Sequence, residues 1–265
     1  MSVKICRTMH QSGRALVRLA VGFLAPNLVG DVTFADKDGL RRVAQATDFV
    51  WWAIVEAVVD DCYRLHGLAS ELRGTVCRVL DIGAHIGLFT VALAKAVPGA
   101  EVTAFEPSAD RVAYLRRNLA GNGLADRVTV AQAAVGGRAG RAGRAGRDIL
   151  IGRQTLLGSE LVSGSAEAAG DLADVVGFDD VMYSIDGSVD LVKVDCGGGE
   201  YDIVVSAPVA TLRRIDCLVV EYHSAPLAQV DQLFATLAEA GLVERWRYGV
   251  LPDQLGTVSF GRTDR

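Results

Sequence analysis

The sequence predicts an α/β protein built around a doubly wound, largely parallel β-sheet. From residue 76 onwards, short apolar runs alternate with amphipathic stretches of helical length, which is the pattern of strands joined by crossover helices. Turn-forming residues such as Pro98-Gly99 and Gly121-Asn122-Gly123 separate successive elements. Hydrophobic residues make up 50% of the 265 positions, so a sizeable core is available.

This alternation of apolar runs and amphipathic stretches predicts the position of each strand and helix along the chain. The predicted strands are Val76–Asp81, Glu101–Glu106, Arg127–Ala133, Asp190–Asp195 and Asp216–Tyr222. The predicted helices are Leu88–Ala96, Pro107–Leu119, a segment near Tyr201–Val205, and Leu227–Leu237. The last two runs, Leu242–Tyr248 and Gly256–Phe260, are expected to form a hairpin around Pro252-Asp253, which adds one antiparallel strand.

Two segments flank or interrupt this pattern. Residues 1–75 are expected to form an N-terminal helical segment before the main domain of residues 76–265, with Asp48 capping a helix that runs to about His66. Residues 134–189 are too long for a bare loop, and Asp148–Arg153 and Asp174–Phe178 are candidate strands there. The Arg-Ala-Gly repeat of residues 138–147 is typical of an exposed, flexible stretch.

Composition limits the classes of partner. The formal net charge of −5 gives no general attraction to nucleic acid. No apolar run approaches the roughly 20 residues of a membrane span. The 5 cysteines form no Cys-x-x-Cys pair, so neither a zinc site nor a redox dithiol is indicated, no other metal constellation is apparent, and a reducing, cytoplasmic setting is expected.

The turn after the first predicted strand, Asp81–Gly87, is the strongest functional signal. Gly83 and Gly87 lack a Cβ atom, so the backbone can turn sharply and a ligand can lie against it. The turn lies at the carboxyl end of a strand, where open α/β sheets bind ligands. Its Gly-x-x-x-Gly spacing, in which Ala84 and His85 directly follow the first glycine, departs from the Gly-x-Gly-x-x-Gly of dinucleotide sites and fits a smaller, cationic ligand.

Glu106 ends the second predicted strand, nineteen residues after Gly87. A carboxylate at this place can accept hydrogen bonds from both hydroxyl groups of a ribose. NAD and S-adenosylmethionine (SAM) both contain such a ribose. Glu106 therefore indicates a nucleoside ligand without choosing between them.

Two further strand ends carry candidate catalytic residues. Asp195 ends the fourth predicted strand, with Lys193 on the same side of that strand, and Glu200 begins the next helix after Gly197–Gly199. Lys193 is also compatible with a partly buried ion pair. His223 follows the fifth strand in Val219-Val220-Glu221-Tyr222-His223, where it is a candidate general base, although a lone histidine is more often structural.

Together these elements resemble the FkbM-like family of SAM-dependent methyltransferases. The similar motifs are V-L-D-I-G-A-H-I-G (79–87), F-E-P-S (105–108), N-L-A-G-N-G-L (118–124), A-A-V-G (133–136), D-L-V-K-V-D (190–195), G-G-E-Y (198–201) and V-V-E-Y-H (219–223). The resemblance implies a Rossmann-like class I methyltransferase fold with a seven-stranded sheet. It also implies SAM as cofactor and O-methylation of a hydroxyl on a natural product, or on a sugar of a glycolipid or polysaccharide.

The resemblance also implies roles for individual residues. SAM would lie over the glycine turn with its ribose on Glu106, and the acceptor would enter above the fourth and fifth strands, with Asp195, Glu200 or His223 as base. The expected cofactor contacts are Asp81, Gly83, Ala84, His85, Gly87, Glu106, Pro107, Ser108 and Ala134, with Asp81 facing the methionine part and Pro107 and Ser108 near the adenine.

Two positions depart from the family pattern. The family usually has asparagine at His85 and glutamate at Gly197. If that glutamate helps to place the acceptor, this chain uses Glu200 or His223 instead, or has altered activity. An NAD-dependent oxidoreductase and a catalytically silent SAM-fold binding module therefore stay open as alternatives. The N-terminal segment could be a lid over the site or the interface of a homodimer.

Overall fold

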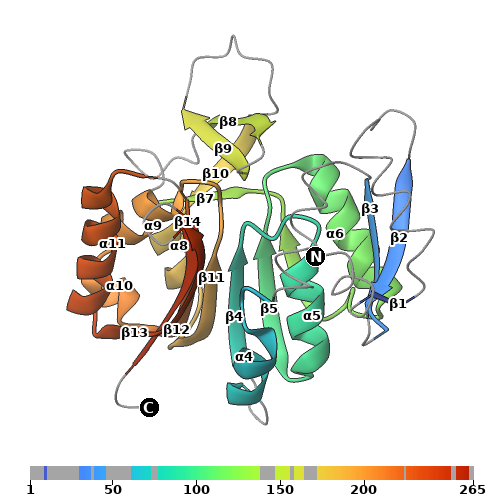
Figure 1. Ribbon diagram of the computed structural model, residues 1–265, viewed down its shortest axis with the longest axis horizontal. Coiled ribbons are helices and arrows are strands. Elements are labelled where there is room, and N and C mark those ends of the chain that lie inside the picture. The colour runs from blue at the N-terminus through green and yellow to red at the C-terminus, as the bar shows by residue number, and fades with distance from the viewer. Residues whose placement is uncertain are drawn as a thin grey trace.

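A computed structural model describes residues 9–10, 30–36, 39–45, 61–72, 77–137, 147–155, 158–163, 172–223, 225–251 and 255–262. A central sheet runs through the middle of the molecule, with helices on both of its faces (Figure 1). The predicted α/β class is therefore confirmed. Within the described residues, no helix is long and apolar enough to cross a membrane.

The main sheet has seven strands in the order β13-β14-β12-β11-β4-β5-β6. They are β4 (Cys77–Ile82), β5 (Ala100–Phe105), β6 (Val128–Ala131), β11 (Val189–Val194), β12 (Ile215–Tyr222), β13 (Leu242–Leu251) and β14 (Leu255–Arg262). Strand β14 is antiparallel to both of its neighbours, whereas the other pairings are parallel. The hairpin and the single antiparallel strand are confirmed, although the turn at Pro252-Asp253 lies outside the described residues.

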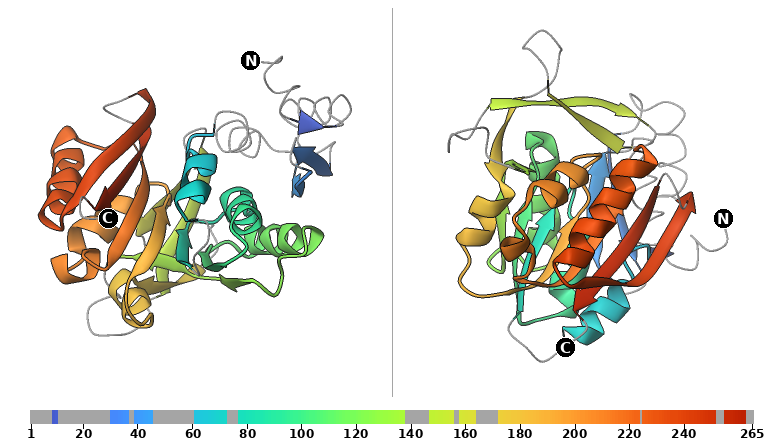
Figure 2. Two further views of the ribbon diagram at one scale, coloured as in Figure 1. Left: turned by 90° about the horizontal axis from the view of Figure 1, so that it is seen from below. Right: turned by 90° about the vertical axis from the view of Figure 1, so that its left-hand side faces the viewer.

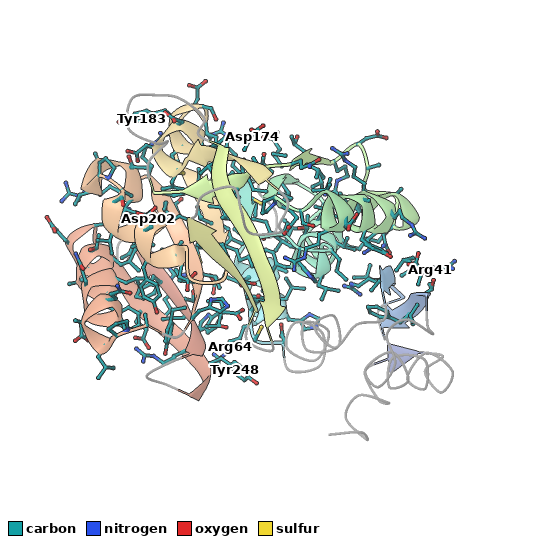
Figure 3. The ribbon with its side chains drawn as sticks, turned by 90° about the horizontal axis from the view of Figure 1, so that it is seen from above. Arg41, Arg64, Asp174, Tyr183, Asp202 and Tyr248 are labelled. Atoms are coloured by element: carbon teal, nitrogen blue, oxygen red, sulfur yellow. The ribbon has the colours of Figure 1, made fainter. Side chains whose placement is uncertain are left out.

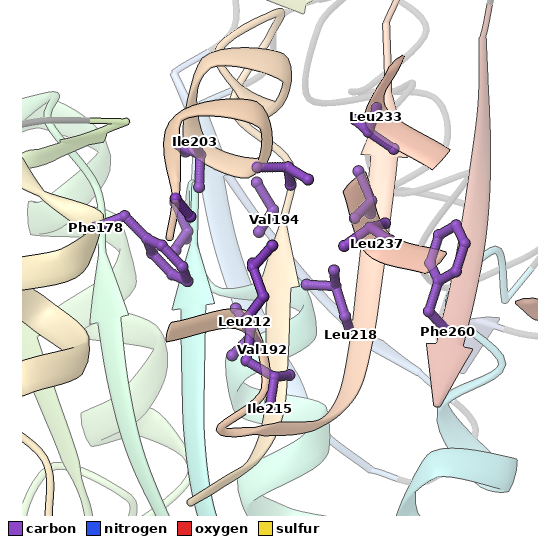
Figure 4. Close-up of a cluster of buried hydrophobic side chains, with 14 of the residues drawn as sticks. Phe178, Val192, Val194, Ile203, Leu212, Ile215, Leu218, Leu233, Leu237 and Phe260 are labelled. Atoms are coloured by element: carbon purple, nitrogen blue, oxygen red, sulfur yellow. The ribbon is translucent and has the colours of Figure 1, made fainter. Parts of the chain in front are cut away.

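Helices on the two faces bury two separate cores. On one face are α4 (Leu65–Glu71), α5 (Leu88–Ala96) and α6 (Ala109–Gly121); on the other are α8 (Phe178–Tyr183), α9 (Glu200–Ser206), α10 (Val209–Leu212) and α11 (Leu227–Glu239). Figure 4 shows the second core, a cluster that includes Val192 and Val194 of β11 together with Phe178, Ile203 and Leu237. Alternate residues of β11 face the first core, so Lys193 lies on the α5 side of the sheet.

The N-terminal part differs from the predicted helical segment. Its described residues include a three-stranded sheet of β1 (Met9–His10), β2 (Asp31–Asp36) and β3 (Arg41–Gln45), which lies beside α6, far from the hairpin β13–β14 (Figure 2). Val32 and Phe34 are buried while Asp31 and Thr33 are exposed, which is the alternation of a half-buried strand. The prediction of helix is therefore wrong for these strands.

Two asparagines of α6 fix this small sheet to the main domain. The Asn118 side chain accepts a hydrogen bond from Val43 N (2.6 Å) and donates to Val43 O (3.1 Å), as a neighbouring strand would. Asn122 pairs in the same way with Arg41 N (3.0 Å) and O (2.6 Å). Asn118 also donates to Ile86 O (2.8 Å), so one side chain joins β3 to the glycine turn.

The helix predicted from Asp48 to about His66 lies mostly outside the described residues. Its described end is not one continuous helix, because Asp61 and Arg64 have positive φ angles of 50° and 46° and α4 begins only at Leu65. This segment is fixed against β13 at two points. Arg64 lies over the Trp246 ring at 5.3 Å, and Glu71 pairs with Arg245 at 3.0 Å. Figure 3 shows Arg64 and Tyr248 of β13 on the same side of the view.

The insertion between β6 and β11 forms a second sheet at the carboxyl end of the main strands (Figure 1). Its order is β7-β10-β8-β9, with β7 at Ala134–Gly136, β8 at Arg147–Thr155, β9 at Gly158–Ser163 and β10 at Leu172–Gly177. The two predicted extra strands correspond to β8 and β10. Residues 138–146 of the Arg-Ala-Gly repeat lie outside the described residues.

Candidate active site

The candidate site lies where the strand order reverses. The chain runs from β4 outward to β5 and β6, and then crosses to β11 on the other side of β4. Such a switch point leaves the carboxyl ends of two neighbouring parallel strands available to a ligand. Gly83 follows β4 with a φ of 79°, and a Cβ atom built on it would lie 1.7 Å from the Asp195 carbonyl oxygen. Only glycine fits here, because the β4 turn and the end of β11 are in direct backbone contact.

Three charged side chains form a row across β4 and β11. Asp81 and Lys193 are register partners on the two strands. The Lys193 ammonium lies 3.1 Å from Asp81 Oδ1 and 3.3 Å from Asp195 Oδ2, and donates to Gly83 O at 2.8 Å. Burial lowers the pKa of Lys193, but the charges of Asp81, Asp195 and Glu221 outweigh burial and raise it above the ordinary value. Lys193 is therefore an ammonium that holds the turn and Asp195, and it cannot accept a proton.

Asp81, which was expected to face the methionine part of SAM, is fully enclosed by protein groups. Its side chain is 0% exposed, Thr90 of α5 donates a short hydrogen bond to Oδ2, and Lys193 faces Oδ1. Both oxygens are therefore directed at protein groups. The geometry favours a structural role for Asp81 beneath the turn over direct contact with the methionine part of SAM.

Tyr63 closes this row from the segment before α4. Its hydroxyl lies 2.7 Å from Asp195 Oδ2 and 2.8 Å from Glu221 Oε2, so a single hydroxyl hydrogen faces two carboxylates. The ring packs edge-on against Phe89 and has the Lys193 ammonium 5.5 Å from its centroid. Burial and the charges of Asp195 and Glu221 raise the Tyr63 pKa well above its ordinary value, so the phenol stays protonated.

Glu106 joins the glycine turn to the start of α6. Its Oε2 accepts a hydrogen bond from His85 N and its Oε1 from Ser108 N, each at 2.9 Å. The residue is 2% exposed, and burial raises its pKa, although Arg111 and the two backbone amides oppose this effect. Burial and the nearby Arg111 also lower the pKa of the His85 imidazole to about 3. His85 is therefore neutral near physiological pH, which suits a wall residue and not a base.

Glu200 and His223 form a second cluster beside Asp195. Glu200 is 0% exposed, and its Oε1 accepts from His223 N at 2.7 Å and lies 3.1 Å from His223 Nδ1. Its Oε2 accepts from Gly198 N at 2.8 Å. Burial lowers the pKa of His223, but the bond to Glu200 and the charges of Glu200, Asp195 and Glu221 raise it to about 10. In this arrangement the imidazole is a cation, so the geometry does not favour His223 as a general base.

The predicted site residues thus divide into two groups. Lys193, Asp195, Glu200 and His223 come together at the carboxyl ends of β11 and β12. Gly83, His85 and Glu106 come together at the ends of β4 and β5, with Ser108 capping α6. Ala84 is buried in the turn, Gly87 is the N-cap of α5, Pro107 precedes the Ser108 cap, and Ala134 is buried at the start of β7.

Gly197, the position where the family usually has glutamate, has a φ of 66°. A glutamate at this backbone conformation would be strained, because L side chains rarely adopt it. The turn after β11 is therefore built for glycine in this chain. The sequence did not predict three residues of the site, Tyr63, Thr90 and Glu221. Glu221 stands in a recognisable motif, but no local pattern in the sequence indicates the contacts that any of the three makes.

The Methyltransferase FkbM domain model matches residues 81–244, which is more than half of the 265 residues. The chain belongs to the FkbM methyltransferase family. SAM is therefore its cofactor, and NAD is disfavoured. The residues fit this group, because a carboxylate such as Glu106 has about four acceptor positions and can bind ribose hydroxyls in addition to two amides.

Two curated relatives share a part of the chain. The chain is 43% identical over 86 residues to the 31-O-demethyl-FK506 methyltransferase FkbM of Streptomyces tacrolimicus, covering 32% of this chain and 31% of that protein. It is 34% identical over 85 residues to methyltransferase sdnD of Sordaria araneosa, covering 32% and 31%. The chain thus matches about a third of the length of each relative.

Solved structures with similar folds have low sequence identity to this chain. M. jannaschii TYW2 in complex with AdoMet is 14% identical with a TM-score of 0.46, covering 88% of this chain and 86% of that one. An rRNA methylase from Streptococcus thermophilus is 13% identical with a TM-score of 0.47, covering 76% and 94%.

Proposed function

We propose that this protein transfers a methyl group from SAM to a hydroxyl oxygen of a small natural product or of a sugar. The observation that carries the proposal is the position of Asp195. Its carboxylate keeps 25% of its exposure at the carboxyl end of β11, while the Gly83 turn touches its backbone. An accessible carboxylate therefore lies directly beside the glycine turn that would bind the cofactor.

When bound, SAM supplies an electrophilic methyl group on a positively charged sulfur. Transfer would join the acceptor hydroxyl oxygen to that methyl carbon while the electron pair of the carbon–sulfur bond leaves on sulfur, so this chain would have to supply a base for the hydroxyl proton. Among the candidate bases, Asp195 is favoured by its exposure. Glu200 is fully buried with both oxygens occupied, and the imidazole of His223 faces Glu200.

The chain's other residues act by holding this geometry. Lys193 and Tyr63 both contact Asp195 Oδ2, which leaves Oδ1 directed towards His223 Nε2 at 4.0 Å. Orientation of this kind is a large source of rate enhancement in direct displacement reactions. The surrounding carboxylates also favour a cationic donor over a neutral or anionic one.

Support for oxygen as the acceptor atom comes from the relative whose printed name describes O-methylation of an FK506 precursor. That relative shares 43% identity with this chain over 86 residues. A hydroxylated natural product is therefore the substrate class to test first. Residues outside the matched region are expected to decide which hydroxyl is used.

The test is transfer of tritiated methyl from SAM into a small-molecule extract of the source cells, run beside SAM calorimetry. Wild type should bind SAM and label a product. Asp195→Asn should keep SAM affinity within a few-fold and lose transfer by about 10²–10⁴-fold, the usual range for a proton-transfer group. Glu101→Gln, on the exposed amino end of β5, is the matched control and should behave as wild type.

Gly197 motivates a second candidate function, a SAM-binding module without transfer activity, because the family's usual glutamate is absent. Normal SAM binding without a labelled product in wild type would favour that candidate. Full transfer activity in Asp195→Asn would instead show that the base has been assigned wrongly.

A further inference from the structure

The carboxyl ends of β11 and β12 bring together three side chains that each offer one metal-binding atom. These atoms, from Asp195, Glu221 and His223, all lie within 4.8 Å of one another, and each residue is partly exposed. Val194 of β11 and Val220 of β12 are register partners, so the residues that follow them are held side by side by the sheet. We propose that these three residues bind a divalent first-row transition-metal cation such as Mn²⁺.

The donor set has the chemistry of such a site. Two carboxylates and one imidazole form a mixed oxygen and nitrogen set, which suits Mn²⁺ and its neighbours better than the all-oxygen preference of Ca²⁺. The two carboxylates balance a charge of +2. Metal–ligand bonds of about 2.0–2.2 Å place ligand atoms roughly 3–4 Å apart, so the separation of 4.0 Å between His223 Nε2 and Asp195 Oδ1 already falls in this range.

The groups behind the three residues provide a second, independent argument. A histidine that binds a metal commonly donates its other ring N–H to a carboxylate, which fixes the orientation of the ring. The fully buried Glu200 occupies this position, 3.1 Å from Nδ1, and its bond to His223 N fixes the backbone as well. Nε2 is thereby turned towards Asp195.

The charge of the cluster also favours a cation. Asp195 and Glu221 share the one hydroxyl hydrogen of Tyr63, so that hydrogen cannot be donated fully to both. A divalent cation bound between the two carboxylates would attract both of them at once.

The role of the cation rests on the proposed function. A cation at these atoms would bind the acceptor hydroxyl oxygen, hold it next to Asp195 and make its proton easier to remove. Each carboxylate oxygen has two lone pairs, so Asp195 can coordinate through Oδ1 and still accept a hydrogen bond from the bound hydroxyl. The cation would thus lower the pKa of the acceptor hydroxyl, so that a carboxylate of ordinary base strength can take its proton.

Titration of Mn²⁺ into the chain of 265 residues tests the site, with the paramagnetic resonance signal of free Mn²⁺ as the readout. Wild type should bind one Mn²⁺ per chain. Glu221→Gln should weaken binding by at least about tenfold, and Glu200→Gln, which keeps all three ligands, by about 10–100-fold. Glu101→Gln, the same substitution at the far end of β5, should bind as wild type does.

The site is overturned if folded wild type binds no Mn²⁺, or if Glu221→Gln and Asp195→Asn bind it as tightly as wild type. A thermal melt of each variant checks folding, and Glu221→Asp, which keeps the charge, replaces Glu221→Gln if the latter does not fold. Mn²⁺ binding without methyl transfer would support the site and count against the proposed function. Full transfer in the presence of a chelator, without Mn²⁺ binding, would do the reverse.

Discussion

Replacing Lys193 by methionine tests the buried row of charges that supports the site. The substitution keeps most of the side-chain volume but removes the ammonium from Asp81, Asp195 and the Gly83 carbonyl. Asp81 is 0% exposed, so its charge would be left without its cation in a buried place. Removing one partner of a buried ion pair costs about 3–5 kcal/mol. That is a large part of the about 5–15 kcal/mol that stabilises a typical domain.

The assay is urea unfolding followed by circular dichroism, at equal protein concentrations. The double variant Asp81→Asn/Lys193→Met removes both charges and should recover about 1–3 kcal/mol relative to the single variant, because no charge at position 81 is left uncompensated. Lys95→Met, on an exposed position near the end of α5, is the control and should cost at most about 1 kcal/mol. A loss below about 1 kcal/mol for Lys193→Met, or no recovery in the double variant, would refute the reasoning.

Three further predictions follow from the same geometry. Gly83→Ala should cost about 2–5 kcal/mol, because a φ of 79° disfavours alanine and its Cβ would lie 1.7 Å from the Asp195 carbonyl oxygen, whereas Gly67→Ala, with open space in α4, should be neutral or stabilising in the same melts. Glu106→Gln should weaken SAM binding in calorimetry by roughly 10–100-fold. Burial raises the pKa of Glu106, so its carboxylate takes up a proton at a higher pH than an ordinary glutamate does. As the pH is lowered, the affinity of wild type for SAM should therefore begin to fall before the ordinary glutamate range is reached, and Glu106→Gln should not show this pH dependence. Asn118→Ala should speed amide hydrogen exchange at Val43, because that amide donates to the Asn118 side chain at 2.6 Å, and unchanged exchange would contradict this account of how β3 is held.

The sequence predicted the main domain well because its signals are local. Helix α5 was predicted as Leu88–Ala96 and has those bounds, since an apolar stretch begins after Gly87 and ends before Pro98-Gly99. The ends of the five parallel strands were predicted within one or two residues, and that was enough to bring Glu106, Asp195 and His223 to one edge of the sheet. The periodicity of the chain therefore carried most of the information about the donor side of the site.

The parts that were missed depend on contacts between distant segments. Tyr63 reaches Asp195 and Glu221 across 132 and 158 positions of sequence, and no local pattern encodes such a contact. Strands β2 and β3 had an alternating pattern around Asp38-Gly39, but the high apolar content of the following segment favoured a helical interpretation of the whole region. The enclosure of Asp81 by Thr90 and Lys193 likewise appears only when α5 packs on β4 and β11.

The most direct test of the central claim is the identity of the atom that receives the methyl group. The product labelled from tritiated SAM would be isolated, and the methyl group located by NMR and mass spectrometry. The proposed function predicts a methyl ether on a former hydroxyl, formed by wild type and lost with Asp195→Asn. A methyl group on nitrogen or carbon, or SAM binding with no labelled product, would contradict it.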